Sequence, residues 1–398
     1  MSTPKIRFKG FKDTWEKRKV GDIITEVSRP IKMEDDQQYQ LVTVKRRNEG
    51  VVSRGLFWGR EILVKNYFEI HTGDYLISKR QLIHGANGQV PEILDGAIVS
   101  NEYMVCIGND NLTAEFLTVL SETKKIKRDF FLSSFGVDIE KFVFDVNDWK
   151  KRDMLVPCIE EQNKISIFFN NLDKLIVLHQ QECCKTKELK KYMLQKMFPK
   201  DSEDVPEIRF KGFSDAWEQR KLGDIADSYS GGTPTAGKSE YYGGSIPFIR
   251  SAEVNSDTTE LYLTDEGLKN SSAKMVRKGD ILYALYGATS GEVGLARLDG
   301  AINQAILDIR PHENFDAPFI MQWLRKSKEN IIGTFLQGGQ GNLSGTIVTS
   351  LMVDCPDYSE QKKIGEFFTN LDNLITLHQH ECDELKEIKK YMLQNMFA

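Results

Sequence analysis

One unit occurs twice in this chain, and the internal repeat constrains the fold more than any other feature. A first block, residues 6–23, returns at residues 208–225 with 14 of 18 positions identical. A second block, residues 161–198, returns at residues 360–397 with 26 of 38 positions identical. The stretches between the blocks correspond only sparsely. The pattern predicts two related supports that carry two different globular heads.

The two heads share enough spacing to indicate a common fold. Residues 73–76 and 100–102 of the first have counterparts at residues 279–282 and 302–304 of the second. Short apolar runs separated by Gly, Asn and Pro are typical of strands. The expected strands are Gln40–Val44, Tyr75–Ser78, Met104–Ile107, Ile246–Ile249 and Ile281–Leu285. With helices expected at residues 113–128 and 317–331, each head is predicted to be an α/β domain of the mixed α+β kind.

Each second block is predicted to be one long helix, because its apolar residues recur at alternating steps of three and four. A helix of this length extends roughly 57 Å, which suits a coiled coil. The order head, helix, head, helix lets the two helices pair antiparallel, so the repeat gives one chain a pseudo-two-fold axis. The seam is expected to include Leu172, Leu175, His179 and Glu182 in the first copy and Leu371, Leu374, His378 and Glu381 in the second.

Two histidines near the midpoints of these helices, His179 and His378, raise the question of a metal site. Neither has a His or carboxylate partner at the spacing of zinc proteins. Antiparallel pairing brings the two midpoints together. We therefore interpret His179, Glu182, His378 and Glu381 as a polar layer that sets the register, and we expect no metal.

These features divide the chain into five segments. A polar stretch between two prolines marks the connection between the two copies. The expected segments are a first head at 1–157, its helix at 158–198, a linker at 199–206, a second head at 207–356 and its helix at 357–398.

The charge balance does not by itself indicate a nucleic-acid partner. The chain has 53 basic and 58 acidic residues, a formal net charge of −5, whereas a free-standing DNA binder usually carries a basic excess. Its six cysteines lack the spacing of a zinc site or a disulfide framework. There is neither an export signal nor an apolar run that would span a membrane. We expect a cytoplasmic protein with reduced thiols and no membrane association.

The run from Gly232 to Ser239 matches the phosphate-loop pattern G-x-x-x-x-G-K-[ST]. A phosphate loop leaves a buried strand and opens a helix, and the polar residues before this run and the Tyr-Tyr-Gly-Gly stretch after it favour neither. No nucleophile elbow, HExxH motif or base-holding Asn-Pro-Pro-Tyr motif is present. We therefore expect no catalytic residues. A nucleotide-binding protein and a coiled-coil adaptor for proteins remain the alternatives to a DNA reader.

A family resemblance rests on several motifs in order. Gly231-Gly232-Thr233-Pro234 leads to Tyr241-Tyr242-Gly243-Gly244-Ser245-Ile246-Pro247, which looks like the opening of a target recognition domain. The block before it, Trp217 to Ile225, and the run Glu360 to Ile364 after the head resemble specificity subunits of type I restriction-modification systems. The likeness covers essentially the whole chain. In the first head, Ser28-Arg29-Pro30 departs from this pattern.

The resemblance implies a non-catalytic subunit that reads a bipartite site on double-stranded DNA, one half-site per head. It implies assembly with two methylation subunits and, for cleavage, two restriction subunits. The chain itself is then expected to hold no cofactor, while S-adenosylmethionine, ATP and Mg²⁺ belong to those partners. The exposed sides of the two long helices and the adjoining head surfaces are the expected partner contacts.

Polar and basic loop residues are the expected base contacts, because Arg and Lys suit guanine while Asn and Gln suit adenine. In the first head they are Lys45, Arg47, Lys79, Arg80, Gln81, His84 and Asn87. In the second head they are Thr233, Thr235, Lys238, Arg250, Ser251, Tyr286, Thr289, Ser290, Gln340 and Asn342.

Overall fold

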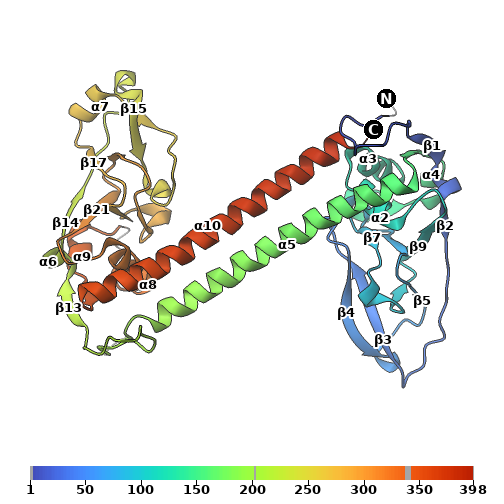
Figure 1. Ribbon diagram of the computed structural model, residues 1–398, viewed down its shortest axis with the longest axis horizontal. Helices are drawn as coiled ribbons and strands as arrows, with labels where there is room; N and C mark the ends of the chain where they lie inside the picture. The colour runs from blue at the N-terminus through green and yellow to red at the C-terminus, as the bar shows by residue number, and fades with distance from the viewer. Residues whose placement is uncertain (1–2, 201–202, 337–341, 398) are drawn as a thin grey trace. The chain divides into compact units, whose positions relative to one another are not determined.

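The computed structural model describes residues 3–200, 203–336 and 342–397. It divides into two compact units, the first made of residues 1–179 with 380–398 and the second of residues 180–379. Each unit contains one head, part of the helix that follows that head, and part of the helix that follows the other head (Figure 1).

The first head is a mixed α/β domain built on two four-stranded sheets. One sheet has the order β2-β9-β6-β7 and the other the order β4-β3-β8-β5, and two short pairs, β1-β12 and β10-β11, complete the head. Its elements are β1 Glu16–Lys19, α1 Val20–Ile23, β2 Ile24–Glu26, β3 Gln38–Val44, β4 Val51–Trp58, β5 Tyr67–Glu69, β6 Tyr75–Ser78, β7 Asn87–Gln89, β8 Ile98–Ser100, β9 Tyr103–Gly108, α2 Ala114–Leu120, α3 Lys124–Leu132, β10 Ser134–Phe135, β11 Val143–Phe144, α4 Val146–Lys150 and β12 Asp153–Val156.

The second head repeats this plan. Its sheets have the orders β14-β21-β18-β19 and β16-β15-β20-β17, and β13 pairs with β22. Its elements are β13 Glu218–Lys221, α6 Leu222–Ile225, β14 Ala226–Ser230, β15 Tyr242–Ile249, β16 Tyr262–Leu263, α7 Asp265–Lys269, β17 Lys274–Val276, β18 Ile281–Ala284, β19 Val293–Leu295, β20 Gly300–Ile302, β21 Ile306–Pro311, α8 Ala317–Phe335, α9 Gly345–Thr349 and β22 Met352–Cys355.

The prediction of two mixed α/β heads with one shared fold is confirmed, and each expected strand lies in or overlaps an observed one. The single helix expected at residues 113–128 is wrong. It is two helices, because Ser121 donates to the carbonyl of Thr118 at 2.7 Å and Thr123 starts a new helix by accepting from the amide of Ile126. Side chains that bond to nearby backbone in this way end one helix and cap the next.

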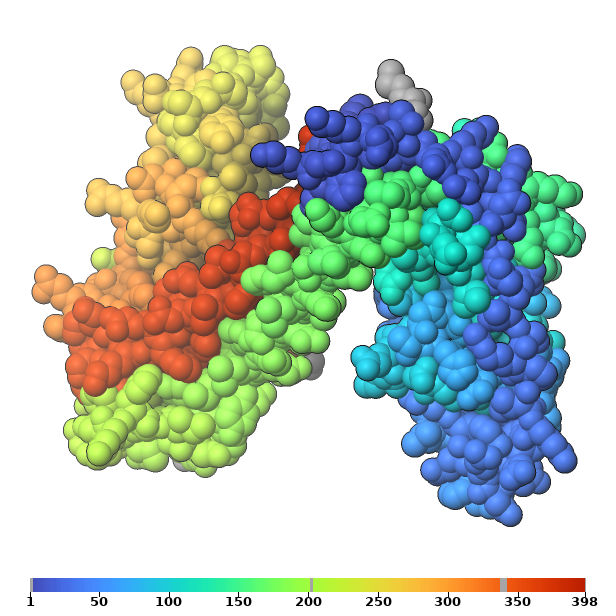
Figure 2. All heavy atoms as spheres, turned by 45° about the vertical axis from the view of Figure 1, so that its right-hand side comes forward, coloured from blue at the N-terminus to red at the C-terminus, as the bar shows by residue number. Residues whose placement is uncertain are grey.

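The repeated first block fastens each head to the beginning of the helix that follows it. Arg7 forms two hydrogen bonds, of 2.6 and 2.7 Å, to the buried carboxylate of Glu161, and Arg209 does the same to Glu360 at 2.7 and 2.8 Å. Figure 2 shows the N-terminal residues, in dark blue, lying against the start of the first long helix, in green. Trp15 and its counterpart Trp217 are buried in the cores of their units.

The two long helices are α5 (Ile159–Lys196) and α10 (Tyr358–Asn395), and each is 38 residues long. Their antiparallel pairing is visible within each unit. In the second unit, Cys183 lies against Ile375 and Lys190 bonds Asp372, so positions rise along α5 as they fall along α10. No helix in the described ranges is long and apolar enough to cross a membrane.

The seam differs in phase from the predicted one. Its buried positions on α5 are Ile165, Phe169, Leu172, Ile176, Cys183 and Lys190, and those on α10 include Ile364, Phe368, Leu371 and Cys382. Leu172 and Leu371 lie in the seam as expected. Leu175 and Leu374 do not, because their side chains are 42% and 44% exposed. Adjacent apolar pairs such as Leu175-Ile176 fit an alternating pattern of three and four in either phase, so the pattern alone did not fix the seam.

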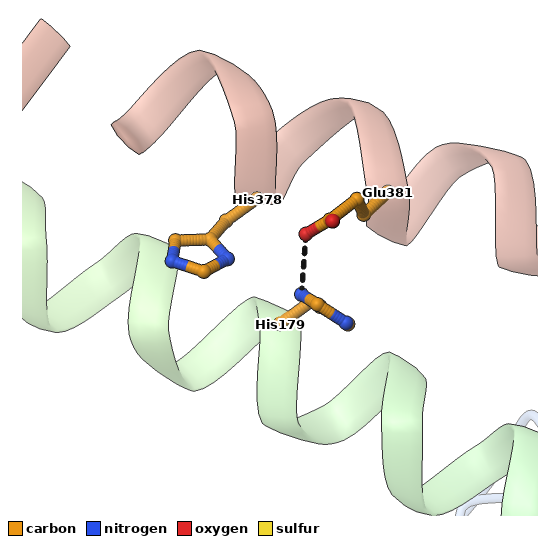
Figure 3. Close-up of side chains that lie close together, drawn as sticks. All are labelled: His179, His378 and Glu381. Carbon is orange, nitrogen blue, oxygen red and sulfur yellow. Dashed lines mark ion pairs between the residues drawn. The ribbon is translucent and has the colours of Figure 1, made fainter. Parts of the chain in front are cut away.

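The predicted polar residues contact one another within the units. In the first unit, His179 Nδ1 lies 2.9 Å from a carboxylate oxygen of Glu381 on the antiparallel helix (Figure 3). In the second unit, Lys185 lowers the pKa of Glu182, and the charge of His378 adds to this effect. Each unit thus places a histidine of one helix near a glutamate of the other.

Candidate nucleic-acid interface

Three loops converge in the first head at the end of strand β6. The turn between β3 and β4 touches the turn after β6, because Arg47 donates its amide to the carbonyl of His84 at 2.7 Å and Asn48 donates to Gly85 at 2.9 Å. Gly85 has a φ of 79°, and a Cβ there would lie 2.8 Å from Asn48 Oδ1, so only glycine permits this approach. The third loop is the β10-β11 hairpin, where Phe144 donates to the carbonyl of Lys79 at 2.8 Å.

Most of the predicted cations in these loops already have a partner. Lys45 lies 3.8 Å from Glu49, Lys79 donates to the carbonyl of Asn101, and Arg80 pairs with Glu102 at 2.8 Å. Arg47 is exposed and, among the described residues, forms no ion pair. It therefore presents the guanidinium that is most available for an external ligand.

The polar side chains beneath this surface have unmet hydrogen bonds. Gln81 Oε1 and His84 Nε2 are buried without a hydrogen-bond partner in the described structure, since the Glu140 carboxylate lies 3.7 Å from His84, too far for a hydrogen bond. The prediction that Asn87 contacts DNA bases is wrong, because its side chain is 2% exposed and its Oδ1 accepts a hydrogen bond from Tyr75 at 2.7 Å. Asn87 is a core residue and not a surface contact.

The second head carries polar loops at the equivalent sheet edge, at the end of β18. Thr233 donates to Gln304 Oε1 at 2.7 Å, and Leu285 donates to the carbonyl of Ala305 at 2.8 Å. Tyr286 forms an antiparallel bridge with Asn342. Three of the predicted residues, Thr233, Tyr286 and Asn342, are thus connected along one edge through a short series of contacts.

The remaining predicted residues of the second head divide into exposed, paired and buried groups. Thr235 is exposed, whereas Ser251 and Thr289 are half-buried. Arg250 pairs with Glu253 at 2.7 Å and Glu260 at 2.8 Å, and these carboxylates raise its pKa. The prediction that Ser290 contacts DNA bases is wrong, since it is 6% exposed and its hydroxyl donates to the carbonyl of Gly287. Gln340 lies outside the described residues.

The phosphate-loop pattern has a structural explanation without a nucleotide. Strand β14 does precede it, contrary to expectation, but only a three-residue 3₁₀ turn begins at Ser239. Lys238 donates to the hydroxyl of Tyr241 at 3.0 Å and lies over its ring. A Cβ on Gly232 would lie 1.9 Å from Ser272 Oγ, so this glycine serves close packing.

Sequence reasoning missed Glu102 and Gln304, which occupy the same place in the two heads. Glu102 forms an ion pair with Arg80 in the first head, and Gln304 accepts a hydrogen bond from Thr233 in the second. Both residues end the short motif that the two heads share, at residues 100–102 and 302–304. The two heads share this motif but differ in its last residue, and that difference is the sequence signal that would have identified Glu102 and Gln304.

A buried carboxylate gives the second head an unusual charge. Asp308 on β21 is 0% exposed, and its oxygens lack a hydrogen-bond partner of good geometry among the described residues, although Arg310 Nε lies 3.0 Å away. Burial raises the pKa of Asp308 to about 6. Because the folded state binds this proton more tightly than the unfolded state, stability falls as the pH rises from about 4 to 6, and the cost persists above pH 6.

Replacing Asp308 with asparagine is expected to raise the free energy of unfolding at pH 8 by roughly 2 kcal/mol, with little gain near pH 4. Urea unfolding at the two pH values measures the difference. Asp227→Asn, at a carboxylate that is 83% exposed, is the control and should leave both values unchanged. An equal gain at both pH values would show that the charge of Asp308 is not responsible.

The comparisons with known proteins agree with this architecture. Residues 214–387 match the family model for the type I restriction modification DNA specificity domain. A specificity subunit of the type I restriction enzyme MjaVIII from Methanocaldococcus jannaschii is 20% identical over 96% of this chain and 91% of its own length. The specificity subunit of EcoR124I/EcoR124II from Escherichia coli is 26% identical, but that match covers only 39% of this chain and 41% of the relative.

A solved structure shares the fold. The S subunit of a type I restriction-modification system from M. genitalium aligns with a TM-score of 0.67 over 100% of this chain and 99% of its own, at 14% identity. Fold, repeat and family match define a two-headed protein on paired helices. Residues 214–387 are thus similar to the type I restriction modification DNA specificity domain, and the chain shares the fold of the solved S subunit.

Proposed function

We propose that this chain reads a bipartite sequence on double-stranded DNA, with one half-site for each head. One observation carries the proposal: both heads present polar loops at the same sheet edge, on the same frame, but with different residues. The first head presents Arg47 and Arg80 at this edge, whereas the second presents hydroxyl and amide groups such as Thr233 and Asn342. Different donors and acceptors at the same edge of the two heads favour different base sequences.

The first head also offers apolar contacts beside its cations. In the β10-β11 hairpin, Phe135 is 57% exposed, Val137 is 100% exposed and Ile139 is 51% exposed. The neighbouring Glu140 lies 3.6 Å from Arg46 of the β3-β4 turn. Apolar side chains next to guanidinium groups suit the methyl group of thymine beside guanine.

The proposal places the chemistry in partner subunits. The chain would act without a catalytic residue or cofactor of its own, while two methylation subunits and two restriction subunits supply S-adenosylmethionine, ATP and Mg²⁺. Exposed apolar side chains on the long helices support a partner contact there, since Leu175, Leu178 and Ile388 are 42%, 48% and 46% exposed. Partners that enclose the duplex would also offset the acidic charge of this chain.

Making both heads identical tests the proposal within this chain. Residues 24–152 would be replaced by residues 226–351, which keeps the strand pairs β1-β12 and β13-β22 intact. Methylome sequencing, with the partner subunits of this system present, is expected to show a motif in which the second half-site occurs twice. The reciprocal exchange is the control and should give the first half-site twice. A motif unchanged by either exchange would contradict reading by the heads.

A further inference from the structure

A cavity of about 670 Å³ opens in the first unit where α3 begins, between β12 and the last turn of α10. Its floor is apolar and includes Trp15, Leu155, Leu393 and Phe397. The ring of Trp15 packs edge-on against both Phe116 and Phe397, with centroids 6.0 Å apart in each case. The floor is therefore built on packed aromatic rings and offers space for an apolar side chain.

Lysines surround this floor. The cavity is lined by Lys5, Lys124, Lys125, Lys127 and Lys390. Lys125 donates to the carbonyl of Asp153, and Lys390 pairs with Glu387, but Lys5, Lys124 and Lys127 form no ion pair within the described part of the chain. The acidic lining residue, Glu122, is paired with Lys389 at 2.9 Å. The rim thus carries an excess of positive charge above an apolar floor.

A smaller cavity with fewer lysines lies beside the corresponding strand pair of the second unit. There the cavity measures about 280 Å³. The repeat and the strand registers set Asp354 at the position of Leu155. Five lysines line the cavity of the first unit, whereas Lys200 and Lys326 line that of the second, together with Ser327 and Asn330. The difference in sequence between the units thus gives the first cavity its greater positive charge.

The second unit also shows what kind of molecule fits this position. There the chain continues past α5 along the cavity, where Pro199 is buried and its carbonyl accepts from Lys326 at 3.1 Å. After Lys200, the linker residues Asp201, Ser202, Glu203 and Asp204 are polar and mostly acidic. A peptide segment leading into acidic residues is therefore the occupant for which this chain offers an example.

We propose that the cavity of the first unit binds an acidic peptide segment of a partner protein, with one apolar side chain seated between Trp15 and Leu155. Lys5, Lys124 and Lys127 would pair with its carboxylates. Duplex DNA would satisfy the lysines with phosphates but has no side chain for the apolar floor. Because the second cavity is smaller and has Asp354 in place of Leu155, one copy binds per chain, unlike partners that follow the repeat and bind twice.

Fluorescence anisotropy of the full chain with a short labelled peptide of glutamates interrupted by leucines tests this site. The double variant Lys124→Ser/Lys127→Asn, which replaces two lysines of the rim by neutral polar residues, is expected to weaken peptide binding about tenfold. Leu155→Asp, the residue of the second unit at this position, is expected to abolish binding. The matched control Lys9→Ser/Lys174→Asn removes the same charge from exposed positions outside the cavity and should not change the affinity.

Three results would overturn the proposal. The first is equal peptide affinity in the wild type and in Lys124→Ser/Lys127→Asn, and the second is an equal loss in the control pair. The third is a loss of affinity for duplex DNA in the cavity variant with peptide binding unchanged, which would assign the lysines to phosphates. A stoichiometry of one peptide per chain by calorimetry is expected. The proposal is independent of half-site reading, which methylome sequencing of the same variants reports separately.

Discussion

Replacing Arg209 with alanine is expected to destabilise the second unit by about 3–5 kcal/mol. The carboxylate of Glu360 is 0% exposed at the first turn of α10, and Arg209 forms two charge-assisted hydrogen bonds to it. Without the guanidinium this charge stays buried without a counter-charge, which is far more costly than the loss of an exposed ion pair. Arg209 also bonds the carbonyl of Asp215, so the substitution frees the repeated block as well.

Chemical unfolding of Arg209→Ala measures this loss, and the double variant Arg209→Ala/Glu360→Gln is its control. Removing the charge of Glu360 should recover a large part of the stability, since the remaining amide is neutral. Arg7→Ala should have a similar effect in the first unit, because Arg7 and Glu161 repeat the same pair. A cost below about 1 kcal/mol would mean that this pair behaves like a surface ion pair.

The second large effect is expected from a charge placed in the helix seam. Ile176→Asp should destabilise the first unit by about 3–4 kcal/mol, because Ile176 is 8% exposed and would place a carboxylate among apolar groups. Leu175→Asp, one residue earlier, is the matched control. Leu175 is 42% exposed, and the cost there should remain below about 1 kcal/mol.

Thermal and urea unfolding of the two variants decide between the two phases of the seam. The structure predicts a large loss for Ile176→Asp and a small one for Leu175→Asp. The opposite order would restore the phase that the apolar pattern alone suggested. Equal losses would mean that both neighbours are buried, which would contradict the exposure of Leu175.

The sequence was most informative where the repeat carried the argument. Identical blocks could be aligned without any structure, and they gave the two heads, the two helices and their pairing. Periodicity was less informative within the helices. Phe168-Phe169 and Leu374-Ile375 are adjacent apolar pairs, so a shift by one residue leaves the pattern equally regular. Burial in the structure selects Phe169, which is 0% exposed, and the 44% exposure of Leu374 excludes that residue.

The candidate site was predictable by location but only partly by residue. Loops at the end of β6 and β18 were found, because they are rich in polar residues and break the apolar runs. Asn87 and Ser290 were misplaced, since the sequence does not distinguish a buried polar side chain from one that faces solvent. In the structure Asn87 accepts a hydrogen bond from Tyr75 and Ser290 donates one to a nearby carbonyl. Ion pairs within the chain also occupy some of the predicted base contacts. Arg250 has two carboxylate partners, which lie three and ten residues away in the sequence.

The backbone bond between Ile6 and Asn395, of 2.9 Å, has a consequence for the chain as a whole. Its counterpart is the bond between Ile208 and Lys196, of 2.8 Å, where the linker connects the two segments directly. The first unit therefore holds its N- and C-terminal segments in the same arrangement that the second unit holds by covalent continuity. A circular permutant that joins these N- and C-terminal segments and opens the chain between Lys196 and Ile208 would therefore retain both bonds. The same structure would then form with the order of the two heads along the chain reversed.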